Sequence, residues 1–301
     1  MGHIYAPDGR VPWARQYAFP PTPYRLDDEL LRIYVAFCDE HTVGRVGYVD
    51  VRLDDPAQVV HVSQRPVLDI GEPGCFDDNG VLPISVLPVG DALYMYYTGY
   101  QLGTKVSYFQ FTGLAISRDG GDTFERWSRA PVVDRSDTET LTRASAFVSR
   151  QGGGFRMHYS AGAEWTMNRA GKPVPIYRLR WMDSDDPTSW PSEGNLCIDF
   201  AAEDEHAIGR PWLIGGTDPH RLLYSYRTTS RDYRLGLALS ADGISWDRRD
   251  EEVGIDVSAD GWDSEAIAYG SVVEHEGAIY LFYCGNERGK TGFGYAELES
   301  W

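Results

Sequence analysis

The sequence has few cysteines, and they show no regular spacing. The four, Cys38, Cys75, Cys197 and Cys284, lie far apart and form no CxxC motif. The cysteines of a secreted disulfide framework recur at short intervals, so we expect free thiols in a reducing compartment. The first residues also lack the apolar stretch of a secretory signal peptide. These two absences predict a cytoplasmic location.

Long apolar runs and positive charge are also scarce. No stretch approaches the roughly 18 consecutive apolar residues that a membrane-spanning helix needs. Lys and Arg number 28 against 45 Asp and Glu, which gives a net charge of −17. So acidic a surface repels phosphate backbones and anionic lipids. We therefore expect neither a nucleic acid nor a membrane as a partner.

Motifs for metals and nucleotides are missing as well. The sequence contains no HxH, HExxH or CxxC spacing. The three glycines at 152–154 have the pattern of a hairpin tip, because no strand before them leads into a helix after them. The sequence therefore predicts no metal and no cofactor.

The sequence does contain a repeat rich in tyrosine. Nineteen Tyr and nine Trp, with 32 Gly and 17 Pro, indicate many short strands and tight turns. A run of tyrosines and aliphatic residues is followed by a polar loop and a second alternating strand, and this pattern returns five times. The five copies are residues 31–37 with 44–51, 92–99 with 111–120, 155–162 with 176–184, 221–227 with 233–243, and 279–286 with 291–298.

One repeat cannot bury both of its faces, so the repeats must stack around an axis. The sequence predicts an all-β fold: a five-bladed β-propeller with mostly four-stranded antiparallel blades around a central channel. We expect one domain over residues 1–301. The N-terminal segment and the last blade should complete each other's sheet and close the ring.

The innermost strand of each blade should precede the tyrosine-rich strand by about one hairpin. This places the five inner strands at residues 13–17, 76–83, 142–147, 206–212 and 262–269. Each segment carries a charged residue, which must be paired or face a wet pocket. The channel is therefore the predicted site.

Paired carboxylates on these segments suit glycoside hydrolysis, in which one donates a proton and the other activates water or attacks the sugar. Asp78 and Glu265 are the candidate catalytic pair, with Glu205 in support. Which of them is acid and which is base depends on local burial.

The remaining charged residues are candidates for substrate binding. Arg15, Arg143 and Arg210 occupy equivalent places on three blades and suit a carboxylate or phosphate on the ligand. The alternative is that they pair with nearby carboxylates and hold the channel together. Asp77 and Asp263 have either a binding role or a turn and capping role, and His206, where its inner strand begins, is a possible ligand contact.

The chain resembles the five-bladed propeller glycosidases, which include arabinanases, invertases and levansucrases (glycoside hydrolase families 32, 43, 68 and 130). The resemblance rests on the five repeats, on two similar turns at 117–124 and 240–246, and on the acidic inner strands. It implies a channel with three carboxylates from successive blades. Asp78 fits one acidic position, whereas Arg15 and Arg143 stand where the superfamily has acids.

Two functions follow from these observations. The first is a glycoside hydrolase-like enzyme that acts on a carbohydrate or glycoconjugate in the channel by carboxylate acid–base chemistry. The alternative is a non-hydrolytic binding or tailoring protein for an anionic glycoside or biosynthetic intermediate. An inert scaffold ranks third, because charged inner strands suit a solvent-free core poorly.

Overall fold

The computed structural model describes residues 2–216 and 218–299, and these residues are almost entirely strands and turns. Antiparallel pairing joins the described strands into five groups of four that follow one another along the chain. The groups are β2 (Gln16–Arg25), β3 (Leu30–Cys38), β4 (Gly44–Arg52) and β5 (Val59–Val62); β6 (Val81–Val89), β7 (Ala92–Leu102), β8 (Tyr108–Ser117) and β9 (Glu125–Arg126); β10 (Thr142–Gln151), β11 (Gly154–Met167), β12 (Pro173–Ser184) and β13 (Asn195–Ile198); β14 (Glu205–Ile214), β15 (His220–Thr228), β16 (Arg234–Ser240) and β17 (Asp247–Arg248); and β18 (Ala268–His275), β19 (Ala278–Cys284) and β20 (Phe293–Leu298) with β1 (Gly2–Tyr5). Two short helical turns, η1 (Asp250–Glu252) and α1 (Asn286–Gly289), complete the described elements.

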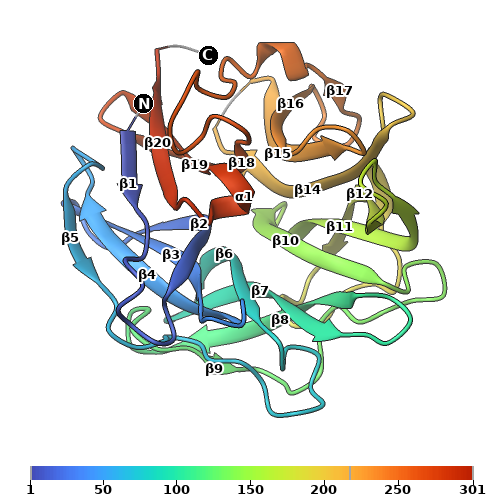
Figure 1. The fold of residues 1–301 in the computed structure, drawn as a ribbon, viewed down its shortest axis with the longest axis horizontal. Helices are drawn as coiled ribbons and strands as arrows, with labels where there is room; N and C mark the ends of the chain where they lie inside the picture. Colours follow the sequence, from blue (N-terminus) through green and yellow to red (C-terminus); the bar gives the residue numbers. More distant parts are fainter. Residues whose placement is uncertain (1, 217, 300–301) are drawn as a thin grey trace.

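The groups are arranged around a central axis, and the chain passes round the ring once (Figure 1). Their first strands, β2, β6, β10, β14 and β18, lie nearest the axis. The predicted all-β propeller architecture with four-stranded antiparallel sheets is confirmed. None of the described helices is long and apolar enough to cross a membrane.

The ring closes where the two ends of the chain meet. Strand β1 pairs antiparallel with β20, with His3 opposite Gly294 and Tyr5 opposite Phe293. The blue N-terminal strand therefore lies beside the red C-terminal strand in Figure 1. The expectation that the N-terminal segment completes the last sheet is confirmed.

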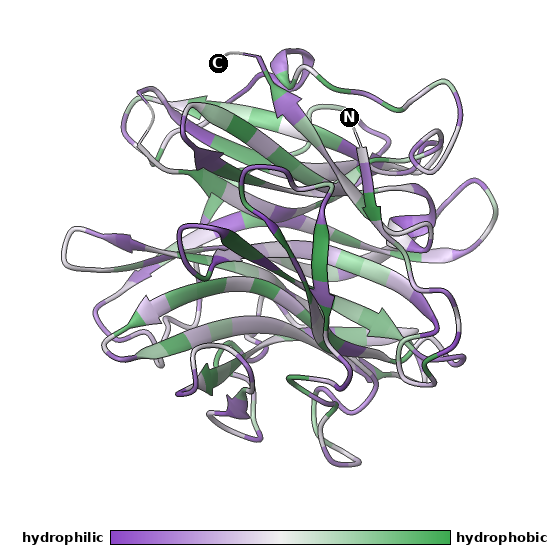
Figure 2. Ribbon diagram, turned by 90° about the vertical axis from the view of Figure 1, so that its left-hand side faces the viewer, coloured by the Kyte–Doolittle hydropathy of each residue, from purple (hydrophilic) through white to green (hydrophobic). Residues whose placement is uncertain are grey.

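The apolar core lies mainly between neighbouring sheets. Figure 2 shows hydrophobic segments alternating with hydrophilic ones along the strands, whereas the loops are mostly hydrophilic. One cluster joins the first sheet to the last, with Leu31 and Phe37 packed in the same cluster as Phe282 and Phe293. The stacking of sheets buries faces that a single sheet would leave exposed.

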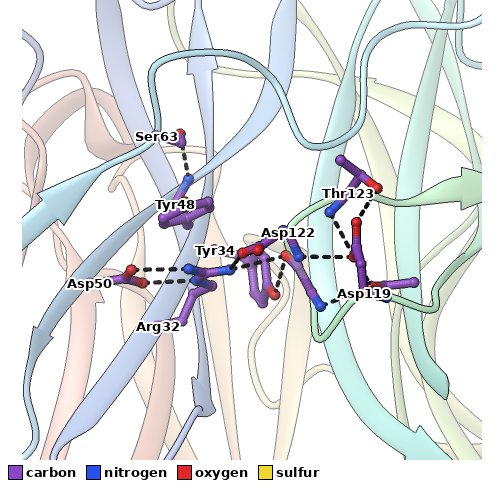
Figure 3. A network of polar contacts seen from close by, with 10 residues as sticks. Arg32, Tyr34, Tyr48, Asp50, Ser63, Asp119, Asp122 and Thr123 are labelled. Carbon is purple, nitrogen blue, oxygen red and sulfur yellow. Dashed lines mark hydrogen bonds and ion pairs between the residues drawn. The ribbon is translucent and has the colours of Figure 1, made fainter. Parts of the chain in front are cut away.

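A buried arginine also ties two neighbouring sheets together (Figure 3). Arg32 on β3 donates two hydrogen bonds to Asp50, at 2.8 and 3.0 Å, and one to Asp122 at 2.7 Å. Its guanidinium lies 3.6 Å from the centre of the Tyr48 ring. Asp122 belongs to the turn after β8, so one side chain links the first sheet to a turn of the second. Arg156 makes the same kind of link between the third and fourth sheets, through Asp183 and the carbonyl of Gly243.

Three of the five inner strands begin later than predicted. Strand β2 begins at Gln16, β6 at Val81 and β18 at Ala268. Strand β2 contains three prolines, and β6 contains two. Proline donates no hydrogen bond and normally argues against a central strand. An inner strand is an edge strand, however, so a missing donor on its channel side is tolerated. Three predicted segments therefore include the loop before the strand, and their charged residues lie in that loop.

Candidate functional site

Each inner strand interrupts its ladder with an irregularity near the axis. The pairing shifts between Gln16 and Phe19, Pro83 and Ser85, Ala144 and Phe147, Gly209 and Trp212, and Ala268 and Ser271. Four of these bulges hold a residue with positive φ: Tyr17 (61°), Ser145 (55°), Arg210 (54°) and Tyr269 (62°). The left-handed conformation costs a residue with a side chain about 1–2 kcal/mol. Bulges redirect side chains beside functional sites, and these four all face one cavity.

In two of the bulges, a side-chain hydroxyl group of the preceding sheet accepts a hydrogen bond from the backbone N–H. The backbone N–H of Ser145 donates to Oγ1 of Thr98 at 2.9 Å, and that of Tyr269 donates to Oγ of Ser225 at 2.7 Å. Thr98 and Ser225 each follow a tyrosine in the second strand of their sheet. A feature of the repeat therefore stabilises the strained backbone around the axis.

The cavity on the axis has a volume of about 460 Å³ and is rich in hydrogen-bond donors. Its lining has no Asp or Glu among the residues described. Three arginines and six tyrosines contribute to it: Arg210, Arg227, Arg288, Tyr17, Tyr100, Tyr108, Tyr177, Tyr233 and Tyr269. The smaller polar lining residues are Thr42, Asn79, Thr98, Gln110, Thr142, Ser145 and Ser160.

Arg210 is almost fully buried, with an exposed fraction of 1%. Its guanidinium donates to the carbonyls of Ile84 and Pro21 and to Oγ1 of Thr22, so it joins β14 to β6 and β2 near the axis. Within the described chain it has no carboxylate partner, and its Nε has no hydrogen-bond partner. Burial lowers the pKa of Arg210 to about 9, which leaves the group positively charged at neutral pH.

The other two arginines lie on neighbouring sheets. Arg227 on β15 lies 4.9 Å from the centre of the Tyr233 ring, and its Nε is buried without a hydrogen-bond partner. Arg288 belongs to the turn α1, where its φ is 63°, and its side chain is exposed. Neither forms an ion pair with any carboxylate of the described residues. Within the part of the chain that the structure describes, the cavity wall therefore has three guanidinium groups and no carboxylate to balance them.

The tyrosines form connected surfaces around the cavity. The hydroxyl groups of Tyr177 and Tyr233 are hydrogen-bonded at 2.7 Å, and the rings of Tyr233 and Tyr269 lie 5.2 Å apart. Burial raises the pKa of Tyr177 and Tyr269 well above the usual value, so both are neutral phenols at neutral pH. A second set, Tyr100, Tyr108 and Trp165, has centroid distances of 5.6 and 5.3 Å. Such faces suit the apolar face of a sugar ring.

The three predicted catalytic carboxylates do not line this cavity. Asp78 lies in the loop before β6, where its Oδ2 accepts a hydrogen bond from Gly74 N–H at 2.8 Å. Glu205 is buried and accepts two hydrogen bonds from Arg248, at 2.7 and 3.0 Å. Glu265 has an exposed side chain, and its carbonyl accepts a hydrogen bond from Arg234. The structure thus gives Asp78 and Glu205 local structural contacts, and their catalytic role stays a prediction.

Among the six predicted binding residues, Arg210 is the one that lines the cavity. Arg143 is buried in an ion pair with Glu139 at 2.7 Å, which matches the alternative structural role. Arg15 is exposed, and its nearest carboxylate, Glu40, is 3.8 Å away. Nδ1 of His206 is hydrogen-bonded to the carbonyl of Pro175 at 2.9 Å, and burial lowers its pKa.

Asp77 and Asp263 belong to a buried contact that recurs in four sheets. In each, a tyrosine of the second strand donates its hydroxyl to a carboxylate from a loop. The pairs are Tyr97–Asp77, Tyr159–Glu139, Tyr224–Asp250 and Tyr283–Asp263. Charged residues near the inner strands therefore stabilise the sheets, and a charge in these segments does not by itself indicate the cavity.

The sequence prediction missed most of the cavity wall. One signal was present: the third residue after the tyrosine of the second strand is Tyr100, Gly162, Arg227 and Asn286 in successive copies. A charged residue at that position in a single copy distinguishes Arg227. Tyr17, Ser145 and Tyr269 gave no such signal, because the bulges that direct them depend on pairing across the sheet.

No family model matches the chain. Uncharacterized protein Rv1502 of Mycobacterium tuberculosis (strain ATCC 25618 / H37Rv) is 33% identical over 300 residues, which are 100% of this chain and 98% of that protein. Among solved structures, a glycoside hydrolase has a TM-score of 0.73 at 21% identity, over 100% of this chain and 91% of its own. A thermostable family-43 glycoside hydrolase has a TM-score of 0.71 at 13% identity, over 95% and 91% of the two chains. At these identities the likeness to the glycosidases establishes the fold.

Proposed function

The chain belongs to the family of the mycobacterial protein Rv1502 and has the fold of the β-propeller glycosidases, and on this premise we propose that its central cavity binds an anionic carbohydrate or glycoconjugate. We take the five four-stranded groups as five blades around that cavity. The sequence suggests two functions, hydrolysis and binding. The groups that face the ligand decide between them.

The main support for an anionic ligand is the imbalance of charge on the cavity wall. Arg210 and Arg227 each have a buried Nε without a partner, and the described lining contains no carboxylate. A buried guanidinium without a counter-charge is costly. An anionic ligand supplies that charge, and guanidinium groups suit carboxylates and phosphates.

The remaining lining suits a sugar. Tyrosine rings offer apolar faces, and the side chains of Asn79, Gln110 and Thr142 offer both donors and acceptors for hydroxyl groups. Hydrolysis by two carboxylates needs an acid and a base on either side of the scissile bond. The described residues of the cavity wall include no such pair, so binding or tailoring of an anionic glycoside is the function that the geometry supports best.

Ligand-dependent stability tests this function. We expect glucuronate or glucose 6-phosphate to raise the melting temperature, and glucose at the same concentration to leave it unchanged. A ligand at a hundred times its Kd stabilises the folded state by about 2.7 kcal/mol. The variants Asp78→Asn and Glu265→Gln should respond to the ligands as the wild type does, because neither residue lines the cavity.

A glycosidase assay on the same proteins separates the two functions. Neutral and acidic nitrophenyl glycosides should give no product with the wild type. Release of nitrophenol that disappears in Asp78→Asn or Glu265→Gln would establish the carboxylate hydrolase and overturn the binding function.

A further inference from the structure

We propose that Arg227 and Arg288, with the hydrogen-bonded pair Tyr177 and Tyr233, form a subsite for a dianionic phosphate monoester, so that the preferred ligand is a phosphorylated sugar. This inference rests on the proposed function and names the chemical class of the anion. It goes beyond that function because a carboxylate, which is a monoanion, would satisfy the general charge requirement equally well.

Two charges of the same sign belong to the same cavity wall. Arg227 and Arg288 line the same cavity and come from neighbouring blades. Arg227 lies 4.9 Å from the centre of the Tyr233 ring, and this tyrosine lines the same cavity as Arg288. Asp232, in the loop before β16, is exposed and forms no ion pair with Arg288 within the described chain. Two positive charges with no bound carboxylate between them favour an anion of charge −2 over one of charge −1.

The hydrogen bonds of the wall also favour an acceptor with many lone pairs. Each phenol has one proton, and one proton of the Tyr177–Tyr233 pair forms the bond between them. The second proton has no acceptor among the described residues and is available to a ligand. Nε of Arg227 is a further free donor in a buried position. A phosphate monoester has three terminal oxygens that only accept in its dianionic form, whereas a carboxylate has two.

The position of Arg210 separates this subsite from the rest of the cavity. Its two terminal nitrogens donate to Ile84, Pro21 and Thr22, so Nε is the one guanidinium nitrogen of Arg210 without a partner within the described chain. Arg227 and Arg288 have no such bonds within the described chain, and both keep their full set of donors. The strongest anion site is therefore at Arg227 and Arg288.

The test compares simple anions with the full-length protein by isothermal titration calorimetry. We expect inorganic phosphate to bind more tightly at about pH 7.5 than at about pH 5, because its second pKa near 6 makes it dianionic over that interval. Sulfate, a dianion at both values, should bind with little change, and acetate should bind at least about tenfold more weakly than sulfate. Protonation of His206 at the lower pH would strengthen anion binding, so it would act in the opposite direction to the expected change.

Variants localise the effect. Arg227→Gln and Arg288→Gln should each lower the affinity for sulfate and for glucose 6-phosphate about tenfold or more. Arg231→Gln removes one positive charge from an exposed position in the neighbouring loop, outside the cavity lining, and should leave both affinities unchanged. Arg288 is exposed, so its substitution should preserve folding if Arg227→Gln fails to fold.

The outcomes distinguish the subsite from the function. If glucuronate binds as tightly as glucose 6-phosphate, or if both arginine variants bind sulfate as the wild type does, the phosphate subsite is wrong and the anionic-carbohydrate function stands. If neither acidic sugar binds at any pH, the proposed function is wrong, and the subsite falls with it.

Discussion

Glu205 is a residue at which a structural and a catalytic role predict different results. Its side chain is 5% exposed and accepts two hydrogen bonds from Arg248. Glu205→Ala should lower the free energy of unfolding by about 3–5 kcal/mol, because it leaves a buried guanidinium with one fewer counter-charge. Urea unfolding measures this loss, and calorimetry should show unchanged affinity for cavity ligands.

The control for Glu205 is Glu203→Ala, two residues earlier and exposed, which should change stability by less than about 0.5 kcal/mol. Loss of ligand binding or turnover in Glu205→Ala with stability unchanged would contradict the structural role and restore the catalytic prediction.

His158 makes stability depend on pH. It is 1% exposed, neither ring nitrogen has a hydrogen-bond partner, and burial lowers its pKa to about 3. Below about pH 6.5 the imidazole of His158 is protonated in the unfolded chain but stays neutral in the folded chain. The free energy of unfolding therefore falls as the pH falls toward 3. Through this group the wild type should lose about 2 kcal/mol of stability between pH 6.5 and 5. His158→Phe should not show that loss.

Urea unfolding at several pH values between 5 and 7 measures this difference. His41→Gln, at an exposed position, should follow the wild type. The same acid dependence in His158→Phe and in the wild type would mean that other groups cause it.

At the scale of the strand, glycine and tyrosine form matched pairs. Gly113 on β8 lies opposite Tyr97 on β7, and Gly236 on β16 lies opposite Tyr224 on β15. A methyl group at Gly113 would lie 2.6 Å from Cε1 of Tyr97, inside contact distance. The ring of Tyr97 therefore requires a glycine beside it. In this position the Tyr97 hydroxyl donates its hydrogen bond to Asp77.

Gly113→Ala should lower the free energy of unfolding by about 3 kcal/mol, because the fixed Tyr97 ring cannot move away. Gly215→Ala is the matched control, since no described residue lies within 4 Å of its added methyl group; it should change stability by less than about 0.5 kcal/mol. Thermal and urea unfolding measure both. Equal effects in the two variants would show that the Tyr97 ring is free to move.

The inner strands explain why the sequence predicted the fold better than the site. Alternation and turn residues recur in every copy, and they determine the sheets locally. The positions of the cavity residues depend instead on bulges. Tyr17 and Tyr269 adopt positive φ there, and no glycine marks these positions in the sequence. Prolines at 20, 21 and 23 also concealed most of β2, because they are tolerated only at the edge that faces the axis.

At the scale of the whole molecule, the repeat predicted the ring but could not assign charges within it. Charged residues occur near every inner strand, and several of them are paired: Asp77 with Arg126, and Arg143 with Glu139. Pairing of this kind depends on distances across the fold. Arg210 lies on an inner strand and lines the cavity, and its role in binding stays a prediction. Arg288 lies in the turn α1, which no inner-strand pattern includes.

Because the ring closes through β1, residues near the N-terminus contribute to the stability of the whole fold. Ile4 on β1 is 9% exposed and packs in the cluster that joins the first and last blades. Ile4→Ala should lower the free energy of unfolding by about 2–3 kcal/mol. For a chain of this size that corresponds to about 3–5 °C in melting temperature.

Val60→Ala is the control, because Val60 is also on an outer strand but is 54% exposed, and it should change the melting temperature by less than about 2 °C. Ligand binding by Ile4→Ala should be unchanged at temperatures where it is folded, since β1 is far along the blade from the cavity lining. A melting temperature equal to that of the wild type would mean that β1 adds no stability to the last blade. The contacts of β18 and β19 with β2 would then hold the propeller closed.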